Sequence, residues 1–521
     1  MLKIATVNEM VQIEKAADAS GLSYDQMMEH AGKSVADALM TAIPEIAGKH
    51  VLVLVGSGNN GGDGLVAARA LAEAAATLVV YLTKNRPADD PHLAALREMG
   101  LLIVNAQEDQ RSRVLKLQLG RTEILIDAVL GTGFRLPLKG SAREVLKAVK
   151  QSGARPYVVA IDCPSGLDCD TGEIADESLI ANLTVTLAAA KPGLFEFPGA
   201  LHVGELAIGD IGLSPRQEEL ASIRREVASV EHMHELLPTR PLDAHKGTFG
   251  RALIAAGSIN YPGAAALAGR GAYLAGAGLV TMAVPASVQM MVAGGIPECT
   301  WLPLGDAFDA AAVDRIEGAW DSSQAFLLGP GFGLESSAAE FVEALFQRKD
   351  AGSRLPPTIV DADGLKLMVR IEGWEALLPT NSVLTPHPGE MAVLTGLPTH
   401  EIQAHRTRVA VEKAAEWGHV VVLKGAFTVV AHPDGRSALI PIATPALARA
   451  GTGDVLAGLL VGYRTQGLSA YDASVLASYV HARAGVLAAQ AVGTTSSVLA
   501  GDVAAAIPGA IAELEIFSPM K

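Results

Sequence analysis

The chain has 521 residues, more than one ordinary hydrophobic core accommodates, so two or three domains are expected. Half of the residues are hydrophobic, only 4% are aromatic and 53 are glycine, a composition typical of an α/β enzyme with many backbone-lined loops. The formal net charge of −15 argues against sequence-independent binding to nucleic acid.

The N-terminal residues lack the apolar segment of a signal peptide. No stretch approaches about 18 apolar residues without polar breaks, so no membrane span is expected. The three cysteines, Cys163, Cys169 and Cys299, lack the number and spacing of a disulfide framework or a zinc site. A reduced, cytoplasmic protein without nucleic-acid or membrane partners is the simplest interpretation, and we expect it to form a homo-oligomer.

Two amphipathic helices are expected at the start of the chain. Asn8 can cap the first, in which Met10, Ile13 and Ala17 share one face. Glu29 lies in the second, where a solvated helix charge is the alternative to a functional role. This second helix begins at about Ser23, and its inward positions are Met27, Met28, Ala31, Val35 and Leu39.

A glycine-rich junction follows the first strand. Val51–Val55 is an unbroken apolar run typical of a strand buried on both faces, and Leu65–Ala72 has helical spacing. The junction between them, Gly56–Gly64, would present backbone N–H groups at the positive end of a helix dipole, where phosphate can bind.

The junction formally satisfies G-x-G-x-x-G at Gly56, Gly58 and Gly61, which is a weak signal by itself. A dinucleotide-binding fold would place a ribose-binding acid after the next strand, but Lys84 stands there. Asn59–Asp63 adds polar positions that a plain phosphate loop does not need. A ligand site is therefore favoured over a tight glycine-rich turn.

Strands and helices continue to alternate, which predicts a Rossmann-like, doubly wound parallel sheet with ligands beyond the carboxyl ends of its strands. Loops at three of these ends supply oxygen atoms from Asn60, Asp127 and Ser165. One carboxylate among neutral oxygens suits a large, weakly charged cation better than magnesium. Asp127 and Asp162 could instead cap turns. The expected strands are Val51–Val55, Thr77–Thr83, Leu101–Val104, Ile124–Asp127 and Tyr157–Asp162, with an edge strand at Gly204–Ile208.

Gly56-Ser-Gly-Asn-Asn-Gly-Gly-Asp-Gly64 resembles the signature of the YjeF N-terminal family, the NAD(P)H-hydrate epimerases. Met28-Glu-His-Ala-Gly32 resembles the family's Met-Glu-Asn-Ala-Gly box, with His30 in place of Asn. The resemblance implies K⁺ held by Asn60, Asp127 and Ser165. It also implies that the hydrated nucleotide contacts Asn59, Asn60, Gly61, Gly62, Asp63, Gly131, Thr132, Gly133, Phe134, Arg135, Leu136, Pro137 and Asp162.

Epimerisation at C6 of a hydrated nicotinamide ring requires proton transfer and stabilisation of a cationic ring intermediate. A carboxylate such as Asp162 could do both, so we expect Asp162 to be catalytic. The backbone N–H groups of Gly131–Gly133 could bind the pyrophosphate, and Arg135 could add positive charge.

The alternation lapses near residues 215–228, where the sequence becomes strongly charged, and a domain boundary is expected there. The expected domains are residues 1–217 and 226–512. A new alternation then starts, and its last four strands end in polar loops that we expect at one edge of a sheet. The expected strands are Arg251–Ala256, Leu279–Val284, Phe326–Leu328, Thr358–Val360, Ser382–Thr385 and Val420–Leu423.

Gly451-Thr-Gly453-Asp454 precedes a helix whose N-terminus would form an anion-binding site. Because a carboxylate beside bound phosphate would normally be repelled, Asp454 suggests a proton acceptor for an attacking hydroxyl. The alternative is an acid that complements the helix dipole.

Gly-Thr-Gly-Asp before a helix resembles the ribokinase-like α/β fold. Together with Pro386–Glu390, Lys424–Thr428 and Asp361–Asp363, it resembles the YjeF C-terminal family, the nucleotide-dependent NAD(P)H-hydrate dehydratases. The resemblance implies Mg²⁺ with ADP or ATP, and the choice of nucleotide stays open. Implied nucleotide contacts are Lys424, Gly425, Ala426, Phe427, Thr428 and Gly453; implied contacts with the hydrated nicotinamide nucleotide are Ala264, Gly331, Gly333, His387 and Asp454. Taken alone, Ala264 could serve close packing and His387 could be a structural loop histidine.

The sequence therefore predicts a bifunctional repair enzyme for NADHX and NADPHX, the hydrates of NADH and NADPH. The first half would interconvert the R and S hydrates, and the second would phosphorylate the C6 hydroxyl of the S form with ADP or ATP and eliminate phosphate. The alternative is a ribokinase-like kinase of a small alcohol with an N-terminal ligand-binding or scaffold module. Tyr471–Gln490 and about Gly501–Leu514 are expected to cover the second sheet, with His481 structural.

Overall fold

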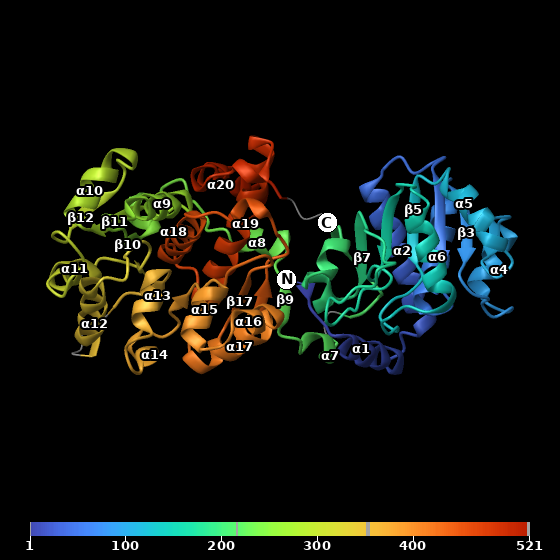
Figure 1. Cartoon of the computed structure of the whole chain (residues 1–521), viewed down its shortest axis with the longest axis horizontal. Coiled ribbons are helices and arrows are strands. Elements are labelled where there is room, and N and C mark those ends of the chain that lie inside the picture. Colours follow the sequence, from blue (N-terminus) through green and yellow to red (C-terminus); the bar gives the residue numbers. More distant parts are fainter. Residues whose placement is uncertain (1, 215–216, 351–354, 518–521) are drawn as a thin grey trace. The chain divides into compact units, whose positions relative to one another are not determined.

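The computed structural model describes residues 2–214, 217–350 and 355–517. The chain divides into two compact units, Leu2–Ile223 and Arg224–Lys521 (Figure 1). Residues 215–216 of the expected domain boundary lie outside the described residues.

The first unit is built on a parallel sheet with the strand order β4-β3-β2-β5-β6-β7-β8. The predicted doubly wound sheet is confirmed, and β8 lies at its edge as expected. β7 is an addition to the predicted strands, although its Leu-Thr-Val-Thr-Leu alternation is typical of a strand. The strands are β2 (His50–Val55), β3 (Thr77–Leu82), β4 (Leu102–Asn105), β5 (Ile124–Ala128), β6 (Tyr157–Ile161), β7 (Leu183–Leu187) and β8 (Glu205–Gly209).

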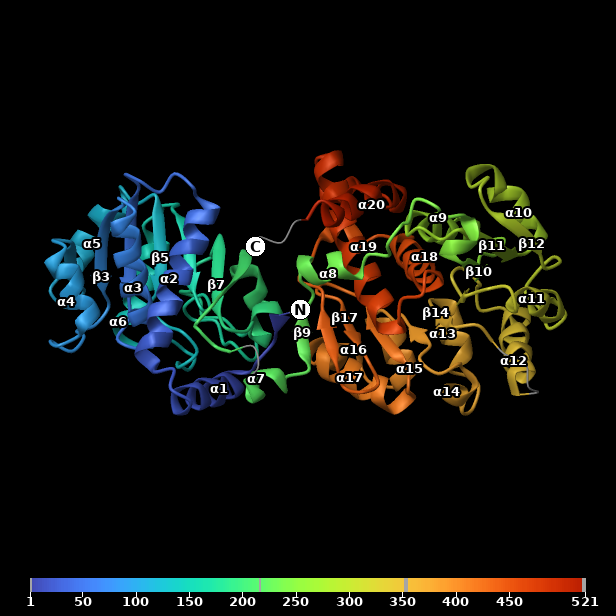
Figure 2. The same cartoon turned by 180° about the vertical axis from the view of Figure 1, so that it is seen from behind.

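Helices cover both faces of this sheet because alternate strand residues point to opposite sides. Val51, Val53 and Val55 of β2 join one apolar cluster, and Leu52 and Leu54 join another. The first cluster is covered by α2 (Tyr24–Ala42), α3 (Asn59–Glu73) and α4 (Pro91–Glu98), and the second by α5 (Arg113–Leu119) and α6 (Gly140–Gln151). Figure 2 shows α2 and α3 side by side.

The first helix, α1 (Val7–Ala19), is capped by Thr6, so the expected cap at Asn8 is wrong. The Thr6 hydroxyl accepts the Glu9 N–H, and the Glu9 carboxylate accepts the Thr6 N–H at 2.7 Å. This reciprocal pair is a capping box, which satisfies two otherwise unpaired donors. The predicted inward face of α1 is confirmed by burial, and α2 begins at about the expected position, with Ser23 as its N-cap.

The helix after β2 begins earlier than its apolar spacing indicates. Gly58 is the N-cap of α3, so Asn59–Asp63 forms the first turns of a helix rather than a loop. Neighbouring backbone approaches this junction too closely for side chains: a Cβ on Gly56 would lie 1.9 Å from the Val129 carbonyl oxygen, and one on Gly61 would lie 2.1 Å from the Gly56 carbonyl oxygen. Glycine is therefore required for packing here.

The second unit contains a mostly parallel sheet with the order β9-β18-β17-β16-β15-β14-β13-β10-β11-β12. β17 is antiparallel to both β16 and β18. β17 and β18 are additions to the predicted strands and extend the sheet beyond β16. β13, β14, β15 and β16 are parallel neighbours, so their polar loops share one edge as expected. The strands are β9 (Arg225–Val227), β10 (Arg251–Ala255), β11 (Leu279–Val284), β12 (Thr300–Pro303), β13 (Ala325–Leu328), β14 (Thr358–Val360), β15 (Val383–Leu384), β16 (Val420–Leu423), β17 (Val429–Ala431) and β18 (Ser437–Leu439).

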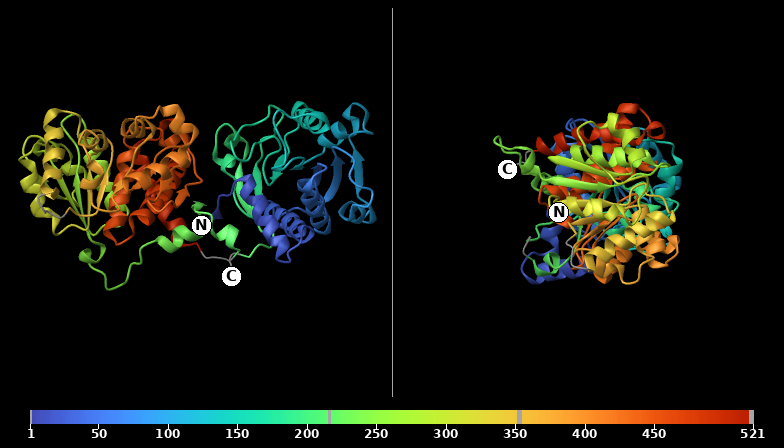
Figure 3. Two further views of the ribbon diagram at one scale, coloured as in Figure 1. Left: turned by 90° about the horizontal axis from the view of Figure 1, so that it is seen from below. Right: turned by 90° about the vertical axis from the view of Figure 1, so that its left-hand side faces the viewer.

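Two helical layers enclose this sheet, and the right-hand view of Figure 3 shows its strands between them. The expected α/β fold class is thus confirmed in both units, and the predicted C-terminal helices cover the sheet. One layer contains α8 (Val230–Leu236), α9 (Pro262–Leu274), α18 (Thr452–Thr465), α19 (Ala470–Val492) and α20 (Ala500–Glu515). The other contains α11 (Ala312–Trp320), α12 (Ser336–Asp350), α13 (Asp363–Met368), α14 (Trp374–Leu377), α15 (Pro388–Thr395) and α17 (Arg406–Trp417).

None of the described helices combines the length and apolar character of a membrane span. Cys163, Cys169 and Cys299 are all buried free thiols.

Candidate functional sites

A cavity of about 700 Å³ lies at the carboxyl ends of strands in the first unit. This is the edge at which open α/β sheets bind ligands. Met10 and Glu14 of α1 form part of its wall. The predicted site residues that line it are Asn59, Asn60, Asp63, Gly131, Thr132, Gly133, Phe134 and Asp162.

Five predicted contacts do not line the cavity: Gly61, Gly62, Arg135, Leu136 and Pro137. Gly61 faces the preceding turn, where a Cβ would lie 2.1 Å from the Gly56 carbonyl oxygen. Leu136 packs against an apolar cluster beneath the loop, and Arg135 is exposed. In this part of the signature, several glycine and apolar positions thus hold the loops in place.

Asp162 lies just beyond β6 in a left-handed conformation, with φ of 66°. This conformation is uncommon for a residue with a side chain, and it turns the chain sharply at the cavity wall. The Asp162 carboxylate accepts the Leu187 N–H at 3.2 Å and contacts the ammonium group of Lys191.

Lys191 is a cavity residue that the sequence does not reveal. It is only 1% exposed, and its Nζ also donates to the Leu187 carbonyl at 2.9 Å and to Thr186 Oγ1 at 3.1 Å. A buried cation needs such partners, because removing one partner from a buried ion pair typically destabilises the fold by about 3–5 kcal/mol. A lysine shortly after the overlooked strand β7 is the signal that could have identified it.

Asp63 contributes a second buried carboxyl group to this cavity. Burial is the main reason that its pKa lies well above the ordinary value, and the nearby Asp162 charge raises it further. Within the described residues, its carboxyl group makes no hydrogen bond or ion pair. The cavity therefore holds acids in contrasting environments, which is typical of acid–base sites.

The three predicted cation ligands come from three elements: Asn60 from the first turn of α3, Asp127 from the end of β5 and Ser165 from the loop after β6. Asp127 is completely buried, and its carboxylate accepts the Ser165 hydroxyl at 2.6 Å and the Ser165 N–H at 3.0 Å. Ser165 Oγ also accepts the Leu130 N–H at 2.8 Å, one residue before Gly131. A Cβ on Gly131 would lie 3.4 Å from the Asn60 side-chain oxygen.

Asn60 provides the test of whether these residues fit a cation. Its Oδ1 and Nδ2 are both buried and have no hydrogen-bond partner among the described residues. An unpaired buried amide costs free energy, so a ligand is the expected partner. Burial raises the pKa of Asp127 despite its bonds to Ser165, which also favours a neutralising charge nearby. The donor set fits a monovalent cation such as K⁺.

Glu29 joins three helices of the first unit. Its carboxylate lies 2.5 Å from Arg69 Nη2 on α3 and 3.4 Å from His92 Nδ1 on α4. It lies outside the cavity lining, so this arrangement favours a structural role for Glu29.

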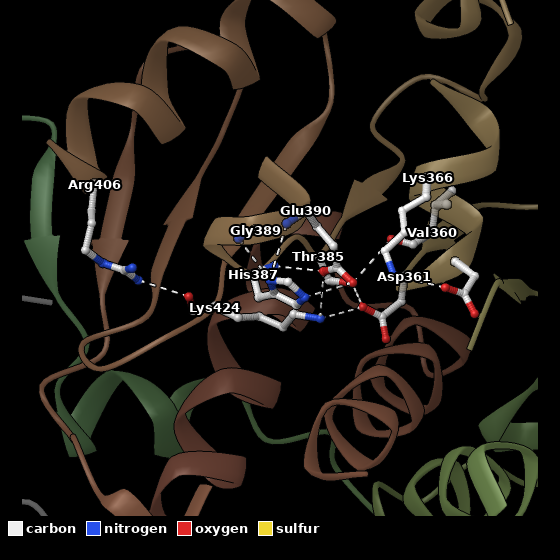
Figure 4. A network of polar contacts seen from close by, with 10 residues as sticks. Val360, Asp361, Lys366, Thr385, His387, Gly389, Glu390, Arg406 and Lys424 are labelled. Atoms are coloured by element: carbon white, nitrogen blue, oxygen red, sulfur yellow. Dashed lines mark hydrogen bonds and ion pairs between the residues drawn. The ribbon is translucent and has the colours of Figure 1, made fainter. Parts of the chain in front are cut away.

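The second unit places a largely buried lysine among acids at the shared edge of its strands (Figure 4). Lys424 Nζ lies 2.7 Å from Asp361 Oδ1 and 3.6 Å from Glu390 Oε2. The Thr385 hydroxyl also donates to Asp361, at 2.7 Å. Although burial disfavours its charge, Asp361 and Glu390 raise the pKa of Lys424, so this lysine is a fixed cation.

Asp454 faces this cluster from the first turn of α18. Its pKa is raised to about 7, mainly by burial and next by the charge of Asp361. Lys424 partly opposes this rise. A Cβ on the preceding residue, Gly453, would lie 3.7 Å from Lys424 Nζ. A carboxyl group with a pKa near neutrality beside a helix N-terminus can exchange a proton at an anion-binding site.

His387 has both a structural and a site-facing side. Its Nδ1 accepts the N–H groups of Gly389 at 3.0 Å and Glu390 at 3.3 Å and so caps α15. Its Nε2 lies 3.4 Å from Glu390 Oε1, next to Lys424 in the same network (Figure 4). Burial lowers the pKa of His387, consistent with a neutral ring whose Nδ1 is an acceptor.

The predicted substrate loops of this unit also meet. Gly331, with φ of 68°, approaches α9 so closely that a Cβ would lie 2.7 Å from the Ala264 Cβ. The Gly333 N–H donates to Asp363 Oδ2 at 2.9 Å, and the Asp363 charge contributes to the raised pKa of Asp454. Ala264, Gly331 and Gly333 therefore belong to the same edge as Asp454.

Arg406 supports the predicted nucleotide loop and is missed by sequence reasoning. Its guanidinium donates to the carbonyl oxygen of Leu423 at 2.9 Å and to that of Lys424 at 3.3 Å. Figure 4 shows the contact with Lys424. Gly425, with φ of 147°, lies against the same guanidinium, where a Cβ would lie 3.0 Å from it. The Thr428 hydroxyl donates to the Gly425 carbonyl at 3.0 Å, which closes the Lys424–Thr428 turn.

Comparison with known families defines the class. Residues 24–193 match the YjeF-related protein N-terminus, and residues 252–509 match the NAD(P)H-hydrate dehydratase family. The two sites thus lie in two different family segments of one chain.

Curated relatives contain both segments. The chain is 34% identical over 530 residues to the bifunctional NAD(P)H-hydrate repair enzyme of Moorella thermoacetica. The alignment covers 98% of this chain and 97% of the relative. It is 33% identical over 486 residues to the enzyme of that name from Escherichia coli, covering 91% and 88%. A solved ADP/ATP-dependent NAD(P)H-hydrate dehydratase from Bacillus subtilis, co-crystallised with ATP/Mg²⁺, is 32% identical, with a TM-score of 0.49, and covers 56% of this chain and 99% of that one. The chain belongs to the family of bifunctional NAD(P)H-hydrate repair enzymes.

Proposed function

We propose that the first unit interconverts the R and S hydrates of NADH and NADPH, and that the second dehydrates the S hydrate at the expense of ADP or ATP. The main support is Asp454, a carboxyl group at the start of α18 whose pKa is raised to about 7 and which interacts with the largely buried cation Lys424. The relatives that span both units favour this function over a small-alcohol kinase with an N-terminal scaffold.

In the dehydratase site, the C6 hydroxyl is a poor leaving group until it is phosphorylated. Asp454 would accept its proton, and the N–H groups at the start of α18 would stabilise the transferring phosphoryl group. Lys424 and the Lys424–Thr428 turn would bind the nucleotide phosphates, and Ala264, Gly331, Gly333 and His387 would contact the hydrated ring. Mg²⁺ bound with the nucleotide would neutralise phosphate charge.

In the epimerase site, Asn60, Asp127 and Ser165 would hold K⁺, which would supply fixed positive charge beside the substrate. Asp162 would move protons at C6 and stabilise the cationic ring intermediate. Lys191 would orient the Asp162 carboxylate. The backbone of Gly131–Gly133 would bind the pyrophosphate.

Two variants with separate readouts test this assignment. Asp454→Asn should abolish NADH formation from S-NADHX with either nucleotide while R and S forms still interconvert. Asp162→Asn should slow interconversion and leave dehydration of pure S-NADHX intact, and thermal unfolding should be recorded because Lys191 loses its partner. If Asp454→Asn dehydrated S-NADHX at the wild-type rate, the proposed role of Asp454 would be wrong.

Homo-oligomerisation and a cytoplasmic location remain predictions. Light scattering of the purified chain and fractionation of cells would test them.

A further inference from the structure

A third acid reaches the epimerase cavity from outside the matched family segment. Glu14 belongs to α1, which precedes residues 24–193. It lines the same cavity as Asp63, Asp162 and Lys191. The acids come from three separate elements: α1, the first turns of α3 and the loop after β6.

Other contacts hold α1 in place without Glu14. Its first turn is closed by the Thr6–Glu9 capping box, and the Val7 N–H donates to Asp170 Oδ1 at 2.9 Å. Ile13 is buried, and its carbonyl accepts Gln217 Nε2 at 2.6 Å. The Glu14 carboxylate itself makes no hydrogen bond or ion pair within the described part of the chain. The fold therefore leaves this half-buried acid available to a ligand.

The surroundings distinguish Glu14 from Asp162. Burial raises the pKa of Glu14, and the Asp162 charge raises it further, while Lys191 opposes them. Asp162 accepts bonds from Lys191 and from the Leu187 N–H, donors that suit an ionised carboxylate. The cavity thus contains one acid, Glu14, whose surroundings favour the protonated form. It contains another, Asp162, whose carboxylate accepts hydrogen bonds from neighbouring donors. Asp63, the remaining acid, is more deeply buried than Glu14.

The chemistry of the substrate calls for two such groups. C6 carries both the hydroxyl group and the ring nitrogen, so loss of water leaves an iminium ion. Inversion occurs when water adds to the opposite face of that ion. The departing hydroxyl needs a proton donor on one face, and the attacking water needs a proton acceptor on the other.

We propose that Glu14 is the second acid–base group of the epimerase site and acts on the C6 hydroxyl with Asp162 on the opposite face. This inference rests on the proposed function of the first unit. In one direction, Glu14 donates a proton as the C6–O bond breaks and water leaves. A new water then forms the C6–O bond from the other face and gives its proton to Asp162. In the reverse direction the two acids exchange roles, so protons and oxygen atoms balance.

The test compares Glu14→Gln with Asp18→Asn, an exposed acid-to-amide change on the same helix. Each full-length enzyme is given pure R-NADHX and, separately, pure S-NADHX, with ADP or ATP. Glu14→Gln should lower kcat for interconversion by about 100-fold or more, with KM little changed. Dehydration of S-NADHX should be unaffected because it takes place in the second unit, and thermal unfolding that matches the wild type shows that the first unit of Glu14→Gln is folded. Asp18→Asn should match the wild type in both assays.

The pH profile separates proton transfer from a structural role. Wild-type interconversion should depend on two ionisations, and Glu14→Gln should lose one of them, whereas Glu14→Asp should retain both at a reduced rate. Wild-type kinetics in Glu14→Gln, a change confined to KM, or an unaltered pH profile would each overturn the role of Glu14. If the wild type itself failed to interconvert the hydrates, the proposed function of the first unit would fail instead, and this inference with it.

Discussion

At the scale of single residues, the burial of Asp454 predicts how the dehydration rate depends on pH. Its pKa of about 7 results mainly from burial and then from Asp361, so the acid is protonated below about pH 7 and cannot accept the substrate proton there. The dehydration rate of S-NADHX at saturating nucleotide should therefore fall about tenfold per pH unit below that value. Rates measured between pH 5 and pH 9 check this expectation.

The Asp361→Asn variant should move this acid limb to lower pH, because it removes a negative neighbour and leaves Lys424 to stabilise the Asp454 carboxylate. Asp321→Asn, an exposed acid on the same unit, is the matched control and should leave the limb in place. A limb that stays unshifted in Asp361→Asn would contradict the electrostatic explanation.

Asn60 predicts a measurable response to cations. Because both of its side-chain polar atoms are buried without described partners, K⁺ should stabilise the first unit by binding there. Thermal unfolding should shift upward with added KCl relative to a bulky organic chloride at equal ionic strength. Asn60→Ala should lose most of that shift, and its exposed neighbour variant Asn59→Ala should keep it. Equal shifts in both variants would exclude Asn60 as a ligand.

At the scale of elements, the junction between β2 and α3 depends on close backbone approach. A Cβ on Gly56 would lie 1.9 Å from a backbone carbonyl oxygen that cannot move aside. Gly56→Ala should therefore destabilise the first unit by about 3 kcal/mol or more, measured by denaturant unfolding. Gly58 has nothing within 4 Å of a built Cβ and a φ of −92°, so Gly58→Ala is the control and should cost much less. Similar losses would contradict the packing argument.

Local sequence patterns predicted the elements that have a strong local signal, such as an apolar run or a glycine turn. They missed the features whose position depends on tertiary contacts. The unbroken apolar run of β2 and the glycine turn before α18 identified both ligand-binding edges. Asn8 is a residue type that often caps helices, but Thr6 is the cap of α1 because only Thr6 has Glu9 at the third helical position to complete a capping box. The start of α3 at Asn59 was hidden because glycine and asparagine are weak helix formers, and close packing overrides that preference.

At the scale of the whole molecule, the candidate sites combine residues far apart in the sequence. Asp162 and its loop were identified by motif, but Lys191 is 29 positions away and Glu14 lies on the first helix. Asp361 and Lys424, 63 positions apart, meet only because β14 and β16 end at the same edge. Spacing within a motif carries no information about such pairs, so the sequence indicated the chemistry without completing the sites.

The most direct test of the bifunctional assignment is recovery of dihydronicotinamide absorbance from an equal mixture of R- and S-NADHX, with ADP and ATP supplied in turn. The full-length chain should restore all of the absorbance with at least one nucleotide, because the first unit supplies S-NADHX as the second consumes it. A rapid phase that stops near half would contradict the proposed epimerase. No recovery with either nucleotide would contradict the proposed dehydratase.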